Sequence, residues 1–193
     1  MNTTSFMQNI NYLDIINEVH RKQLDKFYKL DEFNINALKP KQRGLYWIWS
    51  SLSNEELSKA LHIRGSKHID ISKMIIQRDG FNHICKTQHP TNPEFRIIYN
   101  GIGGFKKRTN SCSGLRERIL QEFNATGVNT GTLSIISTKL NPSKFAVSFF
   151  NFDEKNNTVE LPFLKETNAY LKYASDLEKL WRLEFGIPIL CRH

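Results

Sequence analysis

The sequence predicts an α+β domain in which a small sheet is flanked by helices. Three observations favour this fold class. Short runs rich in aromatic and β-branched residues alternate with amphipathic segments, no segment repeats along the chain, and no series of βαβ units is visible. The chain has 193 residues, 39% of them hydrophobic, which suffices for one domain with an apolar core. We expect a mixed sheet that contains antiparallel pairs.

Residues 1–40 are predicted to form an N-terminal helical arm. Apolar residues recur with a helical period over residues 9–30, and Pro40 ends the segment. Residues 41–193 then form the predicted domain.

The first core strand is predicted over residues 44–51, GLYWIWSS, because aromatic and β-branched residues favour strands. The sequence SNEEL, starting at Ser53, has the spacing of a capping box, and we expect its helix to run to about residue 62. A second helix is predicted over 68–78, before a loop with two prolines. These elements form a predicted helical insertion spanning residues 51–93.

The second half of the chain is predicted to contain three strands and two helices. The strands are expected over residues 94–101, 131–138 and 144–152, where apolar and β-branched residues alternate. Amphipathic periodicity predicts helices over residues 115–123 and 166–185, the second of which is followed by glycine and proline.

The charge of the chain is strongly positive. Lys and Arg number 27 against 19 Asp and Glu, which favours a polyanionic partner such as nucleic acid. No apolar run reaches the ~18–20 residues of a membrane span, and no secretory signal precedes the domain. Cys85, Cys112 and Cys191 are scattered, as in proteins of a reducing compartment, so we expect a cytoplasmic protein. His83, Cys85 and His89 lack the spacing of a structural zinc site, which favours loop residues.

A glycine-rich basic turn begins at Gly101 and continues through Lys106, Lys107 and Arg108. Glycines expose backbone N–H groups and the cations neutralise phosphate, so the turn is a candidate phosphate site. It matches neither a Walker A loop nor a dinucleotide fingerprint. The alternative is a flexible turn between a strand and a helix.

Arg116 and Arg118 lie on the helix that follows this turn. The helical period places Arg118 beside the buried edge and Arg116 further out. An arginine in this position suits the stabilisation of a pentavalent phosphate. The alternative is a solvated basic helix.

Glu178 lies at the boundary of the buried face of the final helix. Its carboxylate is a candidate hard-oxygen ligand for Mg²⁺. The alternative is an ordinary helical ion pair with Arg182 at i+4. Spacing alone does not distinguish Glu178 from Asp176 or Glu184.

These residues together resemble the GIY-YIG nuclease family. GLY at residues 44–46 and YNG at residues 99–101 are similar to the paired strand motifs of that family. Residues 115–119, LRERI, resemble the first conserved helix of the family, which places Arg118 at the invariant arginine. Residues 178–181, EKLW, resemble the Glu-x-x-Trp/Leu element, which places Glu178 at the metal-binding glutamate. The resemblance covers nearly all of the predicted domain but not the arm. Asn100 replaces an apolar residue, and the long insertion between the motifs is typical of restriction enzymes of the family.

The resemblance implies a DNA endonuclease that hydrolyses phosphodiester bonds with one divalent cation, Mg²⁺, for which Mn²⁺ can substitute. Glu178 would hold the ion and Arg118 would stabilise the charge that develops on phosphate. Tyr46 or Tyr99 would activate or orient the attacking water, and the resemblance does not distinguish the two. A tyrosine is a poor base unless its pKa of ~10 is lowered, and a nearby cation such as the metal ion or Arg118 could lower it.

The resemblance also implies partners. Lys106, Lys107, Arg108 and Arg116 would bind the flanking phosphates of double-stranded DNA. A type II restriction-like enzyme that cuts a palindromic site would act as a homodimer, beside a cognate DNA methyltransferase that protects the host. The alternatives are a homing, repair-type or nicking nuclease, a non-catalytic nucleic-acid-binding protein on the same fold, and a partner-binding protein whose charge is incidental.

Overall fold

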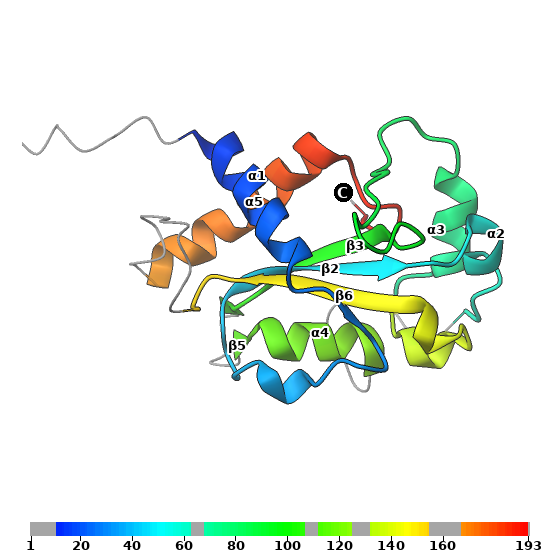
Figure 1. Ribbon diagram of the computed structural model, residues 1–193, viewed down its shortest axis with the longest axis horizontal. Helices are drawn as coiled ribbons and strands as arrows, with labels where there is room; N and C mark the ends of the chain where they lie inside the picture. The colour runs from blue at the N-terminus through cyan, green and yellow to red at the C-terminus, as the bar shows by residue number, and fades with distance from the viewer. Residues whose placement is uncertain (1–10, 63–67, 107–111, 125–131, 155–166, 193) are drawn as a thin grey trace, which may run out of the picture.

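The computed structural model describes residues 11–62, 68–106, 112–124, 132–154 and 167–192 (Figure 1). The α+β class is confirmed. The central sheet has four strands in the order β1-β6-β2-β3. Its strands are β1 (Tyr28–Lys29), β2 (Gly44–Ser50), β3 (Arg96–Gly103) and β6 (Phe145–Asn151).

All pairings within this sheet are antiparallel, so the expectation of a mixed sheet is wrong. A separate antiparallel pair is formed by β4 (Phe105–Lys106) and β5 (Cys112–Ser113). β2 and β3 run antiparallel because the insertion between them reverses the chain direction at one end of the sheet. A parallel pair would instead need a connection that crosses a face of the sheet.

Helices cover both faces of the sheet (Figure 1). On one face, α1 (Tyr12–Leu24) and α5 (Thr167–Phe185) pack over the aromatic side chains of Trp47 and Trp49. On the other face, α4 (Leu115–Asn124) packs over Tyr46 and Ile48. Alternate residues of a strand point to opposite faces, so a central strand covered on both faces buries the side chains of both sets and is mostly apolar. All seven positions of β2 are buried. The strand predicted over 44–51 is therefore confirmed.

The insertion between β2 and β3 contains α2 (Asn54–Leu57) and α3 (Ile71–Arg78). The capping box is confirmed, since Ser53 accepts from the Glu56 amide and the Glu56 carboxylate accepts from the Ser53 amide. The expectation that this helix reaches residue 62 is wrong, because the chain turns after Leu57. The helix predicted over 68–78 begins only at Ile71.

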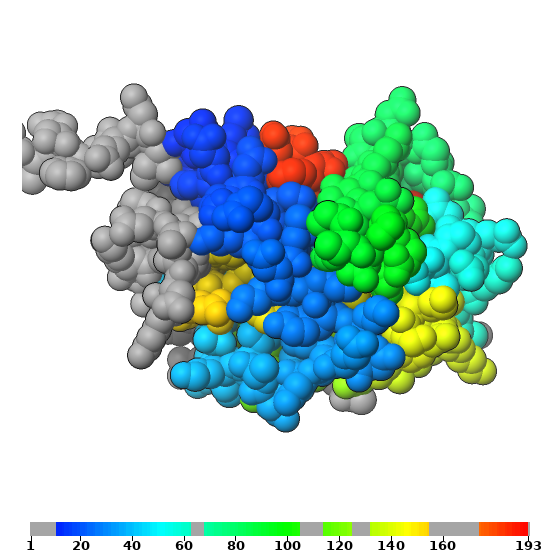
Figure 2. All heavy atoms as spheres, in the orientation of Figure 1, coloured from blue at the N-terminus to red at the C-terminus, as the bar shows by residue number. Residues whose placement is uncertain are grey.

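The N-terminal segment packs on the sheet. The helix predicted over 9–30 ends at Leu24, and β1 then pairs with β6 as an edge strand. Phe27, between helix and strand, packs against Trp49 and His89 with ring centroids 5.8 Å and 4.1 Å away. In Figure 2, this segment and the loop before β3 cover most of the sheet on the side viewed.

The strand predicted over 131–138 is wrong. Its described part contains a 3₁₀ turn, η2 (Ile135–Thr138), flanked by Ser134 and Lys139 at positive φ of 49° and 62°. Leu133, Ser134 and Ile135 are all buried, so the alternation of residue types in the sequence does not correspond to alternating buried and exposed positions here. The other short 3₁₀ turns are η1 (Ile35–Ala37) and η3 (Pro142–Lys144).

The helices predicted over 115–123 and 166–185 are confirmed as α4 and α5, as is the strand predicted over 144–152. Gly186 has a φ of +90°, the left-handed conformation that ends many helices and that glycine adopts without strain. None of the helices in the described residues combines the length and apolar character needed to cross a membrane.

Candidate functional site

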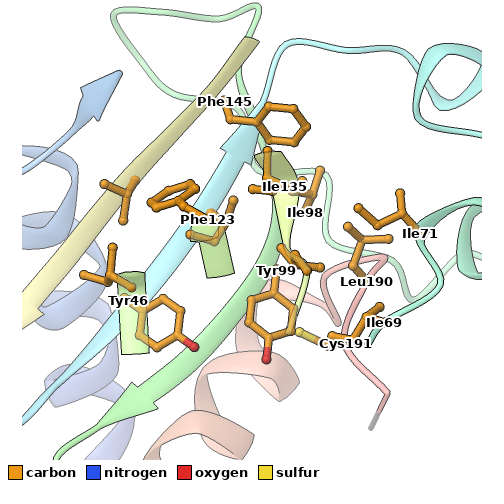
Figure 3. Packing of buried hydrophobic residues seen from close by; sticks show 14 of the residues in the cluster. Tyr46, Ile69, Ile71, Ile98, Tyr99, Phe123, Ile135, Phe145, Leu190 and Cys191 are labelled. Carbon is orange, nitrogen blue, oxygen red and sulfur yellow. The ribbon is translucent and has the colours of Figure 1, made fainter. Parts of the chain in front are cut away.

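Tyr46 and Tyr99 lie on neighbouring strands and on the same face of the sheet (Figure 3). Their ring centroids are 6.3 Å apart. In the register of the two strands, Tyr46 lies opposite Gly101, while Tyr99 lies opposite Ile48. A Cβ at position 101 would be 2.3 Å from the Tyr46 hydroxyl oxygen. The Tyr46 ring can therefore pack over β3 only because residue 101 is a glycine and has no Cβ.

Arg118 points from α4 toward the Tyr46 hydroxyl. Its Nη2 lies 3.5 Å from that hydroxyl and 3.5 Å from Oε1 of Glu122, one turn further along the helix. The Tyr46 hydroxyl donates a hydrogen bond of 2.7 Å to the same Oε1, and the Leu133 amide donates one of 2.9 Å to Oε2. Tyr46 and Glu122 are fully buried, and 15% of the Arg118 side chain is exposed, as expected for a residue at the buried edge.

Glu178 projects from α5 at the boundary of its buried face, with 15% of the side chain exposed. Its Oε1 accepts a hydrogen bond of 2.6 Å from Arg182, so the helical ion pair that was the alternative interpretation does form. Nε of Arg182 also donates to Oδ1 of Asn100, at 2.9 Å. Asn100 is buried and its Oδ1 accepts from the Cys191 thiol, while its Nδ2 lacks a partner in the described part of the chain.

The ionisable groups from these four elements influence one another. Burial raises the pKa of Glu178, and the charges of Arg182 and Arg118 act in the opposite direction. Burial also raises the pKa of Tyr99, and the negative charges of Glu122 and Glu178 raise it further. The charges of Glu178 and Arg118 therefore act on each other, and that of Glu178 also acts on Tyr99. The direct contacts are those of Tyr46 with Tyr99 and Arg118 and of Glu178 with Arg182.

Arg118 is the nearby cation that acts on the pKa values of both tyrosines. Burial raises the pKa of Tyr46 well above its ordinary value; Arg118 acts in the expected direction, but burial outweighs it. For Glu122, burial raises the pKa while Arg118 lowers it. Both tyrosines are therefore neutral phenols near pH 7.

The predicted phosphate-binding cations are only partly described. Lys106 is the last residue of β4, whereas Lys107 and Arg108 lie outside the described residues. Arg116 follows the first residue of α4 and is partly buried, and its Nε has no hydrogen-bond partner among the residues described.

A metal ion at this site would depend mainly on Glu178. Across the described ranges, no three or more His, Cys, Asp or Glu side chains form a group that could hold a metal. Mg²⁺ commonly uses one or two carboxylates, substrate phosphates and several waters, so the partly exposed carboxylate of Glu178 has suitable donor chemistry. The carboxylate of Glu122 is already bonded to Tyr46 and Leu133.

Three residues of the cluster were not predicted as site residues: Glu122, Arg182 and Asn100. Glu122 carries a signal in the sequence, because Leu115, Ile119 and Glu122 follow the four- and three-residue steps of a buried helical stripe. A carboxylate on such a stripe is expected to have a specific partner. That partner, Tyr46, could not be found from the sequence because it lies on a distant strand.

Comparison of the chain with protein-family models, with curated proteins and with solved structures found no match. The chemistry of the cluster and the order of its residues must therefore support any functional interpretation.

Proposed function

We propose that this protein is a divalent-metal-dependent DNA endonuclease of the GIY-YIG type, and that it cuts double-stranded DNA at a specific site as a type II restriction enzyme does. One observation carries the proposal. Tyr46, Tyr99, Arg118 and Glu178 follow the order of the motifs of that family. Tyr46 lies beside Tyr99 and 3.5 Å from Arg118, and the charge of Arg118 acts on Glu178.

The residues have the chemistry that phosphodiester hydrolysis requires. The Arg118 guanidinium can stabilise negative charge on the phosphate, because a guanidinium has five N–H donors and can bind Tyr46 and a phosphate oxygen together. A tyrosine hydroxyl would hold the attacking water. Tyr46 is fully buried, so substrate reaches its hydroxyl only after the side chains that cover it move.

Glu178 would hold Mg²⁺, or Mn²⁺ in its place, and the ion would supply positive charge that neutralises the phosphate and assists the departing oxygen. Arg182 bonds Oε1 of Glu178 and is itself held by Asn100, which fixes the direction of the carboxylate. Arg182 is in this respect part of the proposed site.

The net charge of +8 supports DNA as the partner, because a basic surface attracts the phosphate backbone. Lys106, Lys107, Arg108 and Arg116 are proposed to contact phosphates beside the cut. Cleavage of a palindromic site would require a homodimer, and a cognate DNA methyltransferase would protect the host's own sites.

A second candidate is a non-catalytic DNA-binding protein on the same fold. The observation that favours it is the burial of Tyr46 and Glu122, whose mutual hydrogen bond is also what a polar pair in a protein core would make. Such a protein would bind DNA in EDTA with a steep salt dependence and would cut no strand.

Incubation with unmethylated plasmid and phage DNA, in Mg²⁺, in Mn²⁺ and in EDTA, distinguishes these candidates. Discrete fragments that require a metal ion are the expected result. Nicked or unevenly degraded DNA would instead indicate a homing or repair-type nuclease. Binding without cleavage of any DNA in either metal would refute the endonuclease proposal.

A further inference from the structure

We infer that Glu122 accepts the proton of Tyr46 during hydrolysis, so that Tyr46, and not Tyr99, is the tyrosine that takes a proton from the attacking water. This inference rests on the proposed nuclease function. Glu122 acts through Tyr46 and is in this sense a positioning residue.

The geometry defines one donor and one acceptor. The Tyr46 hydroxyl donates to Oε1 of Glu122 at 2.7 Å, a short hydrogen bond to a carboxylate. The Leu133 amide, at 2.9 Å from Oε2, fixes the second oxygen, so the carboxylate is oriented from both sides. Within the described residues, no carboxylate accepts a hydrogen bond from the Tyr99 hydroxyl.

A carboxylate is a costly choice for this position. A buried carboxylate loses its hydration, and Arg118, 3.5 Å away, compensates the charge only in part. A neutral side chain could accept the Tyr46 hydrogen bond without that cost. A carboxylate can also bind the proton itself, which an amide does not do near neutral pH.

The surroundings of Glu122 determine when it can take a proton. Burial raises the pKa of its carboxyl group, which makes it a stronger base than a carboxylate in water. The charged and titratable groups that act on it or respond to it are Tyr46 on β2, Tyr99 on β3, Arg118 on its own helix, Glu178 on α5 and Cys191 in the C-terminal segment.

The proton transfers balance. The step requires that the side chains covering the buried Tyr46 hydroxyl first move to admit water. As the water oxygen then forms its bond to phosphorus, a water proton passes to the Tyr46 oxygen and the Tyr46 proton passes to Oε1 of Glu122. The bond from phosphorus to the 3′ oxygen breaks, and that oxygen leaves with its electron pair and takes a proton from solvent. Tyr46 is neutral before and after the step, so its raised pKa is no obstacle. Glu122 later returns the proton to solvent.

The test compares Glu122→Gln with Glu117→Gln, which removes another carboxylate from the same helix. Under single-turnover conditions, we expect Glu122→Gln to cut DNA at least about 100-fold more slowly, because positioned acid–base groups contribute ~10²–10⁴-fold. Its affinity for DNA in Ca²⁺ should be unchanged. The rate should still fall at acid pH through Glu178, whose pKa burial also raises, but the fall should begin at a different pH because Glu122 no longer titrates. Glu117→Gln should match the unaltered protein in all three respects.

Glu122→Asp keeps a carboxylate and serves if the glutamine variant does not fold. It should cut at an intermediate rate, and its fall in rate at acid pH should stay close to that of the unaltered protein, which a role in packing alone does not predict. An unchanged rate in Glu122→Gln would overturn the inference about Glu122 and leave the nuclease proposal standing. Failure of the unaltered protein to cut any DNA would overturn both.

A measurement without DNA tests the pairing itself. In protein labelled with ¹³C at glutamate carboxyl carbons, the signal lost in Glu122→Gln identifies the residue, and its titration can be followed by NMR. Because the hydrogen bond from Tyr46 favours the ionised carboxylate, Tyr46→Phe should raise the pH at which this signal titrates, and Tyr99→Phe should do so less. An unchanged titration in Tyr46→Phe would refute the inference.

Discussion

Replacing Gly101 with alanine should destabilise the protein through one contact. The added Cβ would lie 2.3 Å from the hydroxyl oxygen of Tyr46 and 2.5 Å from Cζ, closer than carbon and oxygen can approach. The ring cannot move away cheaply, because it is fully buried and its hydroxyl is bonded to Glu122. Gly101 is in a strand and not at positive φ, so alanine meets no backbone strain there.

The expected cost has two parts. Forcing a ring out of a packed core costs about 1–3 kcal/mol, and leaving the buried Glu122 carboxylate without its donor costs about 1–3 kcal/mol more. In a chain of this length each kcal/mol lowers Tm by ~2–4 °C, so Gly101→Ala should lower Tm by about 4–24 °C. Without the ring, the same change would stabilise the fold by roughly 0.4–1 kcal/mol, because alanine reduces the entropy of the unfolded chain.

Thermal unfolding of a double-mutant cycle checks this reasoning. Gly101→Ala is measured alone and in a Tyr46→Ala background, where the ring is absent. The substitution should be strongly destabilising alone and nearly neutral or stabilising in the second background. Equal effects in the two backgrounds would refute the packing of Tyr46 over Gly101.

Two further predictions concern groups outside the site. His20 is partly buried against α5, where desolvation lowers its pKa to about 4, and its Nδ1 accepts a hydrogen bond from Trp181. Since the unfolded chain takes up a proton near pH 6.5 and the folded chain does not, this contribution to stability is present above pH 6.5 and is lost as the pH falls toward 4. His20→Phe should show a smaller decrease in Tm over that interval, and an equal decrease would contradict the assignment. Arg78 donates to carbonyl groups of residues 189–192, so Arg78→Met should cost about 1–3 kcal/mol and speed amide exchange in that segment. Lys73→Met, at an exposed position of the same helix, should change neither quantity.

Much of the fold could be predicted because its signals are local. The strand at Gly44–Ser50 consists of residues that favour strands, the Ser53 capping box needs only four residues, and Gly186 ends the last helix by its own conformational freedom. The errors arose where distant contacts decide. Residues Tyr28–Lys29 continue a helical pattern in the sequence but form a strand, because β6 offers them an edge to pair with.

The site shows the same division. Tyr46, Tyr99, Arg118 and Glu178 could be proposed from motif order, but their environment could not. The burial that raises the tyrosine pKa values depends on how helices on both faces of the sheet pack, and no spacing in the sequence encodes it. Glu122 became a candidate only when the fold brought it to Tyr46.

The cleavage rate of Glu178→Gln tests the central claim most directly. Glutamine keeps the size of the side chain and removes the charge that would hold a metal ion. Glu184→Gln, at an exposed position on the same helix, is the matched control. In a single-turnover assay with Mg²⁺ or Mn²⁺, the account predicts that Glu178→Gln loses about 100-fold or more in rate while Glu184→Gln keeps the rate of the unaltered protein. DNA cleavage by Glu178→Gln at an undiminished rate would contradict the proposed site.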